Sequence, residues 1–154
     1  RFTADGLEHN EQGTPSAKHS DHLVQLDKRQ RKLADFDFGE DWAQLSGEGR
    51  VTLLSFGSAS APVAEAAAQL AAQGVATRQV ALRLLAPLQC EALDEALAGS
   101  AHVLVVEQNH SAQLFHYLKG CMDFDQQVHS LAQPGPVPLN AQQIVSHVLA
   151  LEEQ

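Results

Sequence analysis

Two short stretches of the sequence carry side chains suited to chemistry or ligand binding. The first is Phe56-Gly57-Ser58-Ala59-Ser60, a Gly/Ser turn that follows an apolar run. A turn of this kind before a helix exposes backbone N–H groups, which suit an anion. The turn lacks the further glycines of a G-x-G-x-x-G fingerprint and the lysine of a P-loop. We therefore favour a structural turn at Gly57 and Ser58 over a ligand site.

The second stretch is Glu107-Gln108-Asn109, with Gln113 one helical turn further on. A carboxylate at the end of a strand can act as an acid, a base or a hydrogen-bond anchor. Asn109 is suited to cap the helix that follows, and Gln113 to face the same crevice. No Ser-His-Asp or Cys-His arrangement with a diagnostic local motif accompanies these residues. We favour an anchor or a subunit contact over a catalytic role for Glu107.

Histidines and basic residues near the start of the chain offer two further hypotheses. His19 and His22 stand three residues apart, a spacing that can chelate a metal, and His9 precedes them. No third ligand is fixed by the sequence and the HExxH pattern is absent, so solvated or interface histidines are favoured. The basic run 28–32 has no interleaved aromatic residues, which favours a solvated or partner-facing surface over a phosphate site.

Composition narrows the classes of function. The 154 residues suffice for one ordinary domain with a core, and a net charge of −9 argues against a general nucleic-acid binder. No apolar stretch reaches the roughly 18 residues of a membrane span, and no secretory signal is present. Cys90 and Cys121 form no CxxC pair and have no metal-ligand spacing. We expect reduced cysteines in a cytoplasmic protein, without an iron–sulfur cluster held by this chain.

From Val51 onward, predicted strands and helices alternate. The predicted strands are Val51–Phe56, Thr77–Leu85, His102–Glu107 and Gln127–Leu131. The predicted helices are Ala61–Gln73, Pro87–Ala98, Ser111–Lys119 and one capped by Asn140, with Gln143 in capping-box position. This alternation predicts an α/β fold, a three-layer, open, mostly parallel sheet with helices on both faces. Functional loops of such sheets lie at the carboxyl ends of the strands, here Gly57–Ser60, Leu85–Pro87, Glu107–His110 and Pro134–Pro138.

The first fifty residues have a different character. Residues 1–16 are polar and are predicted to be irregular or extended. Residues 19–35 predict a moderately amphipathic helix with Leu23, Leu26 and Leu33 on one side. Residues 36–50 return to loop character. We therefore predict a division into residues 1–50, a linker that packs against another body, and residues 51–154, the α/β domain.

Taken in order along the chain, these motifs resemble the α subunit of 2-oxoacid:ferredoxin oxidoreductases, the 2-oxoglutarate type especially. Thr3–Gly13 is similar to its TG-x-EH-x-E-x-G stretch, and His22 with the basic run 28–32 resembles its H-x-x-x-x-x-KR-x-RK helix. Phe56-Gly57-Ser58 resembles its GS turn. Pro87, and Glu107-x-Asn109 followed by Gln113, resemble its P and E-x-N-x-x-x-Q positions. The sequence departs from the family at Ser111-Ala112, where glycine is usual.

The resemblance implies a fold and a biochemical setting. Residues 51–154 would form a transketolase C-terminal-like domain, and residues 1–50 the end of a pyrimidine-binding domain with a linker helix. The family oxidatively decarboxylates a 2-oxoacid such as 2-oxoglutarate to its acyl-CoA. It uses thiamine diphosphate, magnesium and coenzyme A, and passes electrons through iron–sulfur clusters to ferredoxin. The chain begins with Arg1 rather than Met, and the resemblance implies that the subunit extends upstream of it.

The cofactors of the family are not expected on this chain. The thiamine-binding GDG…NN motif and the cluster cysteines are absent from the sequence, and a catalytic β subunit would carry them. No catalytic, cofactor-binding or metal-ligating residue is therefore assigned. Gly57, Ser58, Glu107, Asn109 and Gln113 are predicted to form ligand or interface loops. The alternative is a stand-alone flavodoxin-like or nucleotide-binding module that uses the Gly57–Ser60 turn.

Overall fold

The computed structural model describes residues 6–153, which fall into two compact units. One unit ends at Phe38 and the other begins at Gly39. Residues 1–5, which include the start of the Thr3–Gly13 stretch, and Gln154 lie outside the described residues. No helix within residues 6–153 is both long enough and apolar enough to cross a bilayer.

The first unit consists of a tight loop and one helix, α1 (His19–Ala34). The loop is closed by backbone hydrogen bonds, among them Ser16 N–H to the Glu8 carbonyl at 2.9 Å. A single antiparallel bridge joins His9 to Pro15. The helix predicted at 19–35 is thus confirmed to within one residue. Its apolar side chains remain largely exposed, with Leu23 at 46% and Leu33 at 54%.

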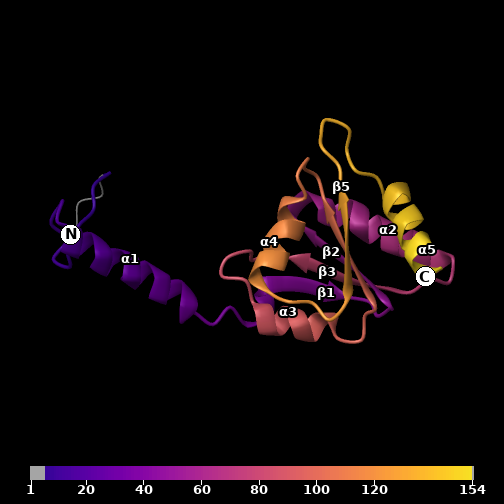
Figure 1. Cartoon of the computed structure of the whole chain (residues 1–154), viewed down its shortest axis with the longest axis horizontal. Helices are drawn as coiled ribbons and strands as arrows, with labels where there is room; N and C mark the ends of the chain where they lie inside the picture. Colours follow the sequence, from indigo (N-terminus) through magenta and orange to yellow (C-terminus); the bar gives the residue numbers. More distant parts are fainter. Residues whose placement is uncertain (1–5, 154) are drawn as a thin grey trace. The chain divides into compact units, whose positions relative to one another are not determined.

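The second unit is built on a sheet that has five strands within the described residues, in the order β1-β3-β2-β4-β5 (Figure 1). Four strands run parallel to one another: β2 (Val51–Phe56), β3 (Thr77–Leu82), β4 (His102–Glu107) and β5 (Gln127–Ala132). The edge strand β1 (Ala43–Ser46) runs antiparallel to β3. Because β2 and β4 are paired on both edges and covered on both faces, all of their residues except Phe56 are buried, and their sequences are mostly apolar.

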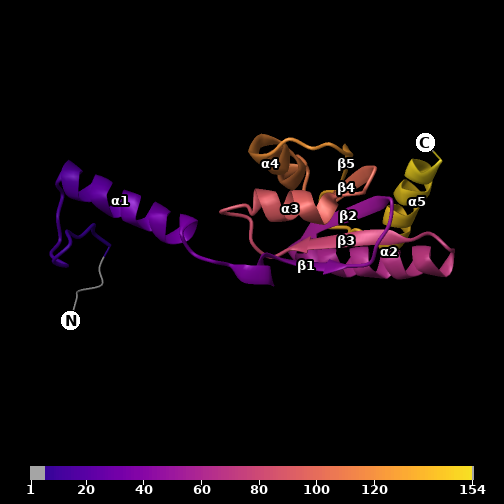
Figure 2. The ribbon, with the colours of Figure 1, turned by 90° about the horizontal axis from the view of Figure 1, so that it is seen from below.

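Helices cover both faces of this sheet and enclose two separate cores (Figure 2). The helices α2 (Ser60–Ala72) and α5 (Ala141–Glu152) pack on one face, and α3 (Cys90–Leu97) and α4 (Gln113–Cys121) on the other. Successive strand residues alternate between the two cores, so that Leu53 faces α2 and α5 whereas Leu54 faces α3 and α4. The predicted three-layer, mostly parallel α/β fold is confirmed.

The prediction of loop structure for residues 36–50 is wrong from Gly39 to Ser46. A 3₁₀ turn, η1 (Gly39–Trp42), leads into β1, and Trp42 is buried at 6% exposure in the core beneath α3 and α4. The compact unit therefore begins at Gly39 rather than at Val51. The physical reason is edge pairing, since backbone hydrogen bonds to β3 can form with little help from the side-chain pattern.

The ends of the elements differ from prediction in smaller ways. The strand predicted at Thr77–Leu85 ends at Leu82, and the helix predicted from Pro87 begins at Cys90. The start of α5 is as predicted: Asn140 and Gln143 form a capping box, with two hydrogen bonds of 3.0 Å.

Gly49, in the connection from β1 to β2, packs closely against a neighbouring segment of backbone, and this close packing can be tested. A Cβ atom at Gly49 would meet backbone atoms where β3 begins, at 2.6 Å from the Ala76 carbonyl carbon and 2.7 Å from Thr77 Cα. Backbone cannot rotate aside as a side chain can, so we expect Gly49→Ala to lower the free energy of unfolding by about 1–3 kcal/mol. Urea denaturation followed by far-UV circular dichroism measures this change.

Gly120 provides the matched control. It lies in α4, and a Cβ atom there would meet nothing within 4 Å. Because alanine favours helix over glycine, Gly120→Ala should leave stability unchanged or raise it by up to about 1 kcal/mol. Equal destabilisation by both substitutions would contradict the assigned close approach at Gly49.

Candidate functional site

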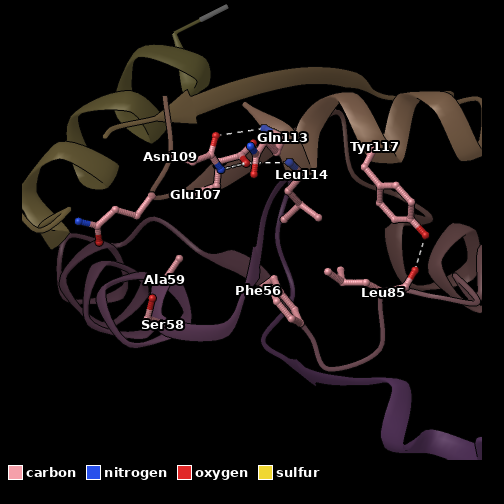
Figure 3. A pocket seen from close by; sticks show the side chains of 10 residues that line it. Phe56, Ser58, Ala59, Leu85, Glu107, Asn109, Gln113, Leu114 and Tyr117 are labelled. Atoms are coloured by element: carbon pink, nitrogen blue, oxygen red, sulfur yellow. Dashed lines mark hydrogen bonds between the residues drawn. The ribbon is translucent and has the colours of Figure 1, made fainter. Parts of the chain in front are cut away.

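The order in which the chain adds strands to the sheet reverses between β2 and β4. The chain runs from β2 to β3 on one side and then returns to β4 on the other side of β2. Open parallel sheets place their ligand crevice at such a point, outside the carboxyl ends of the strands. A cavity of about 370 Å³ lies there (Figure 3). Its described lining residues are Phe56, Ser58, Ala59, Leu85, Glu107, Gln108, Asn109, Gln113, Leu114 and Tyr117.

The Glu107 carboxylate connects the end of β4 to the start of α4. It is buried at 5% exposure and accepts hydrogen bonds from the backbone N–H groups of Leu114 at 2.7 Å and Phe115 at 3.0 Å. The Asn109 amide donates a further, short hydrogen bond to the same carboxylate. A negative charge at a helix N-terminus satisfies N–H groups that have no partner within the helix and interacts favourably with the helix dipole.

Asn109 completes this helix start from the loop side. Its Oδ1 accepts hydrogen bonds from the backbone N–H groups of Ser111 at 3.1 Å and Gln113 at 3.2 Å. Ala112, between these two residues, has a left-handed backbone with φ of +50°. That backbone conformation favours glycine, so the hydrogen bonds on either side help to hold an unfavourable alanine in place.

The Glu107 carboxylate thus has a structural role, because its oxygens already accept hydrogen bonds from the chain itself. Its oxygens point at donors of the chain itself, as Figure 3 shows. The amide side chains of Gln108, Asn109 and Gln113 bring neutral donors and acceptors to the cavity. Lysine, arginine and histidine are absent from its described lining. The arrangement is suited to holding a neutral or amphipathic group by hydrogen bonds rather than to acid–base chemistry.

The Gly/Ser turn lies on the opposite wall of the cavity from these amides. Gly57 has φ of +63°, which favours glycine, and it starts a 3₁₀ turn, η2 (Gly57–Ala59), that leads into α2. Ser58 and Ala59 line the cavity, whereas Gly57 does not. The Ser60 hydroxyl lies 3.2 Å from that of Ser55. Of the predicted site residues, Ser58, Glu107, Asn109 and Gln113 are therefore brought together at one cavity.

Tyr117 and Leu85 line the cavity but were not among the predicted site residues. Tyr117 lies one turn beyond Gln113 on the same helix, and its hydroxyl donates to the Leu85 carbonyl. Burial raises the pKa of the Tyr117 phenol, which therefore stays protonated at neutral pH. The four-residue spacing from Gln113 is the signal that would have found Tyr117. Leu85 belongs to a loop predicted to be functional, but nothing in its own type singled it out.

The described residues offer no ligand set for a metal ion or an iron–sulfur cluster. Across residues 6–153, His, Cys, Asp and Glu side chains nowhere gather in threes or more in a way that could hold a metal ion. Cys90 and Cys121 are both free thiols. Neither magnesium nor an iron–sulfur cluster therefore has a recognisable ligand set in this part of the molecule.

The predicted histidine and basic residues of the first unit meet around Glu8. Arg29 binds its carboxylate with both guanidinium nitrogens, at 2.6 and 3.0 Å, and His22 Nδ1 lies 3.2 Å from it. The Arg29 hydrogen bonds hold the pKa of Glu8 at about 2, well below its ordinary value. His19 does not join this group. The EH and KR motifs thus serve to fasten the loop to α1.

Comparison with known proteins identifies the class of this domain. The sequence matches the family described as transketolase, C-terminal domain, over residues 40–152. The chain therefore belongs to that family. Its structure is similar to that of a split-gene transketolase, solved as an inactive β4 tetramer, with 25% identity and a TM-score of 0.62 over 75% of this chain and 43% of that chain.

Other similarities concern a particular subunit. The chain is 36% identical over 119 residues to the α subunit of 2-oxoacid:ferredoxin oxidoreductase 2 from Aeropyrum pernix, covering 74% of this chain and 18% of that protein. It also matches a 2-oxoglutarate:ferredoxin oxidoreductase from Magnetococcus marinus, solved with 2-oxoglutarate, coenzyme A and succinyl-CoA bound. The identity is 27% and the TM-score 0.75, over 97% of this chain and 26% of that one. The resemblance drawn from the sequence motifs is confirmed. The chain spans only about a fifth to a quarter of these two relatives.

The anchoring role of Glu107 can be tested by an isosteric change. In Glu107→Gln an amide NH₂ replaces one oxygen and faces an N–H donor, so a buried donor loses its acceptor. We expect the free energy of unfolding to fall by about 2 kcal/mol and the amides at the start of α4 to exchange faster with solvent. Urea denaturation and hydrogen exchange measure the two effects. Glu65→Gln, on the exposed face of α2, is the control and should change stability by less than about 0.5 kcal/mol. A Glu107→Gln protein as stable as this control would refute the anchor.

The Glu8 network predicts a pH dependence confined to the first unit. A carboxyl whose pKa is lowered on folding stabilises the fold above its ordinary pKa of 4.5, and this stabilisation is lost as the pH falls through about 2. In a ¹³C NMR titration, the Glu8 carboxyl should titrate near 2 in the native chain. In Arg29→Gln it should move toward the ordinary value. An unchanged titration in Arg29→Gln would show that Arg29 is not the cause.

Proposed function

We propose that this chain is the C-terminal part of the α subunit of a thiamine diphosphate-dependent 2-oxoacid:ferredoxin oxidoreductase. In this proposal it is not itself catalytic. It serves the assembly of the subunits, and the crevice at the carboxyl ends of β2 and β4 shapes the surroundings of an active site completed by other parts of the enzyme. The whole enzyme converts a 2-oxoacid to its acyl-CoA, with 2-oxoglutarate as the favoured substrate.

The observation that carries the non-catalytic role is the commitment of Glu107. A general acid or base must reach the proton it transfers, whereas the Glu107 carboxylate accepts hydrogen bonds from Leu114, Phe115 and Asn109. The remaining polar lining of the cavity consists of amides and hydroxyls. Groups of this kind position a neighbouring loop or a substrate and do not drive bond cleavage on their own.

Similarity to the two ferredoxin-linked relatives supports the choice of enzyme. The match to the Magnetococcus marinus enzyme includes the first unit as well as the sheet, because it covers 97% of the chain. We accordingly assign the first unit, which ends at Phe38, to the end of a pyrimidine-binding domain and its linker helix, and the chain from Gly39 onward, including β1, to the sheet domain. That protein was solved with 2-oxoglutarate bound, which favours the same oxoacid here.

Cofactors and partners follow from the proposed subunit. A β subunit would hold thiamine diphosphate, magnesium and an iron–sulfur cluster, since the described residues of this chain offer no ligand set for a metal ion. Coenzyme A would be a substrate of the whole enzyme and ferredoxin its electron acceptor. When bound in the partner, thiamine diphosphate supplies the carbanion chemistry that decarboxylation requires. A cytoplasmic location and an oligomeric enzyme are parts of the same proposal.

The alternative is a stand-alone flavodoxin-like or nucleotide-binding module that uses the Gly57–Ser60 turn. The turn does stand at a strand end before α2, where backbone N–H groups can meet an anion. Among the described residues around the cavity, however, no lysine or arginine is present to neutralise phosphate. Charge therefore disfavours this alternative.

Titration with thiamine diphosphate and reconstitution of the enzyme test the proposal. The chain alone should show no thiamine diphosphate binding by isothermal titration calorimetry and no 2-oxoglutarate- and coenzyme A-dependent reduction of ferredoxin. The full-length α subunit, coexpressed with its β subunit, should copurify with that subunit and show this activity. Gln113→Ala, which removes an amide from the cavity wall, should lower the activity of the assembled enzyme more than Gln69→Ala on α2.

Two outcomes would overturn the proposal. Tight binding of thiamine diphosphate by the chain alone would place the active site here. Tight binding of a flavin or nucleotide by the chain alone, without copurification of a β subunit, would favour the alternative module.

A further inference from the structure

The two cysteines of the chain come together although 31 positions separate them. Cys90 is the first residue of α3, and Cys121 is the last residue of α4. The Cys90 thiol points at the backbone carbonyls of Leu88, at 3.7 Å, and Cys121, at 3.8 Å. The Cys90 sulfur therefore lies against the main chain of the other cysteine.

Tyr117 shows on which side the Cys121 thiol lies. The two residues are one helical turn apart on α4, so their side chains share a face. The Tyr117 hydroxyl donates to Leu85, in the loop that leads to α3. Burial raises the pKa of the Tyr117 phenol, and a side-chain hydrogen bond with Cys121 and the charge of Cys90 raise it further. The Cys121 side chain thus lies on the same face of α4 as Tyr117, which lines the cavity.

Access to the two thiols is unequal. Cys121 is exposed, whereas Cys90 is partly buried. The chain leaves α4 immediately after Cys121, with Met122 already extended. A thiol at the end of a helix can shift further than one in its middle, because fewer hydrogen bonds hold it.

We propose that Cys90 and Cys121 form a thiol–disulfide exchange site, which low-molecular-weight disulfides convert to a reversible intrachain disulfide between α3 and α4. The site is independent of the function proposed above. Its consequence is that the oxidation state of the pair alters the wall of the cavity at Tyr117.

The exchange balances without any further reactant. The Cys121 thiolate attacks one sulfur of oxidised glutathione, which forms a mixed disulfide and releases one glutathione thiolate. The Cys90 thiolate then attacks the Cys121 sulfur, which forms the Cys90–Cys121 bond and releases the second glutathione. Two protein thiols are oxidised and one glutathione disulfide is reduced to two thiols, while the two protein protons pass to the released thiolates.

Exchange with oxidised glutathione in dilute solution tests the site. Free thiols should fall from two to none per chain, and the intact mass should decrease by two hydrogen atoms. Peptide mapping without reduction should recover Cys90 joined to Cys121, and dithiothreitol should reverse the change. Cys90→Ser and Cys121→Ser should instead accumulate one stable glutathione adduct each. In denaturant the yield of the intrachain bond relative to mixed disulfides should fall at least about tenfold, because the fold no longer holds the thiols together.

A spectroscopic readout separates this site from simple surface oxidation. Tyr117 is the chain's single tyrosine, so phenolate absorbance reports it alone. Burial is the main cause of the raised pKa of Tyr117, and Cys121 and Cys90 add to it. A disulfide removes the contributions of the two cysteines, so the phenol should titrate at lower pH in the oxidised chain. Two glutathione adducts per native chain, or disulfides only between chains, would overturn the proposal. So would an intrachain bond that leaves the Tyr117 titration unchanged, because the pair would then not adjoin the cavity wall.

Discussion

The Glu107 carboxylate joins the carboxyl end of β4 to the first turn of α4, and the candidate site depends on this junction. A carboxylate left without partners at 5% exposure would cost several kcal/mol, so it must be paired. Backbone N–H groups at the start of α4 supply the partners. The same hydrogen bonds that remove the cost of burial fix where α4 begins. They thereby place Gln113 and Tyr117, one turn apart, on the cavity wall.

The two cores explain why this junction can be rigid. Leu104 of β4 packs beneath α2 and α5, whereas Val103 and Val105 pack beneath α3 and α4. The strand is held from both faces and paired on both edges, so its carboxyl end has little freedom. Rigid strand ends with variable loops are the arrangement in which α/β sheets build ligand crevices. The order of the strands determines where the crevice lies, and the side chains at the strand ends and in the loops determine its chemistry.

The sequence predicted the parts of the fold in which side chains dominate. The apolar runs of β2 and β4 and the capping box of α5 are local signals, and the structure has them where they were expected. The edge strand β1 was missed because only one of its four residues is buried, so its side chains show no strand pattern. Its pairing rests on backbone hydrogen bonds. The polar residues Ser58, Glu107, Asn109 and Gln113 were found, since polar side chains at or just after strand ends are conspicuous. Leu85 and Tyr117 were not, because only the tertiary fold brings an ordinary loop leucine against a helix 32 positions away.

The spacing of Glu107, Asn109 and Gln113 follows from the geometry of a strand-to-helix turn. Glu107 must reach the N–H groups of Leu114 and Phe115, while Asn109 must reach those of Ser111 and Gln113. Two acceptors that serve successive N–H groups at one helix start cannot be moved apart or exchanged without leaving donors unsatisfied. The motif by which the chain resembles the α subunits is therefore explained by structure before any catalysis is invoked. A polar motif in an enzyme family can mark the scaffold of a site, and here its carboxylate holds the wall on which other residues face the crevice.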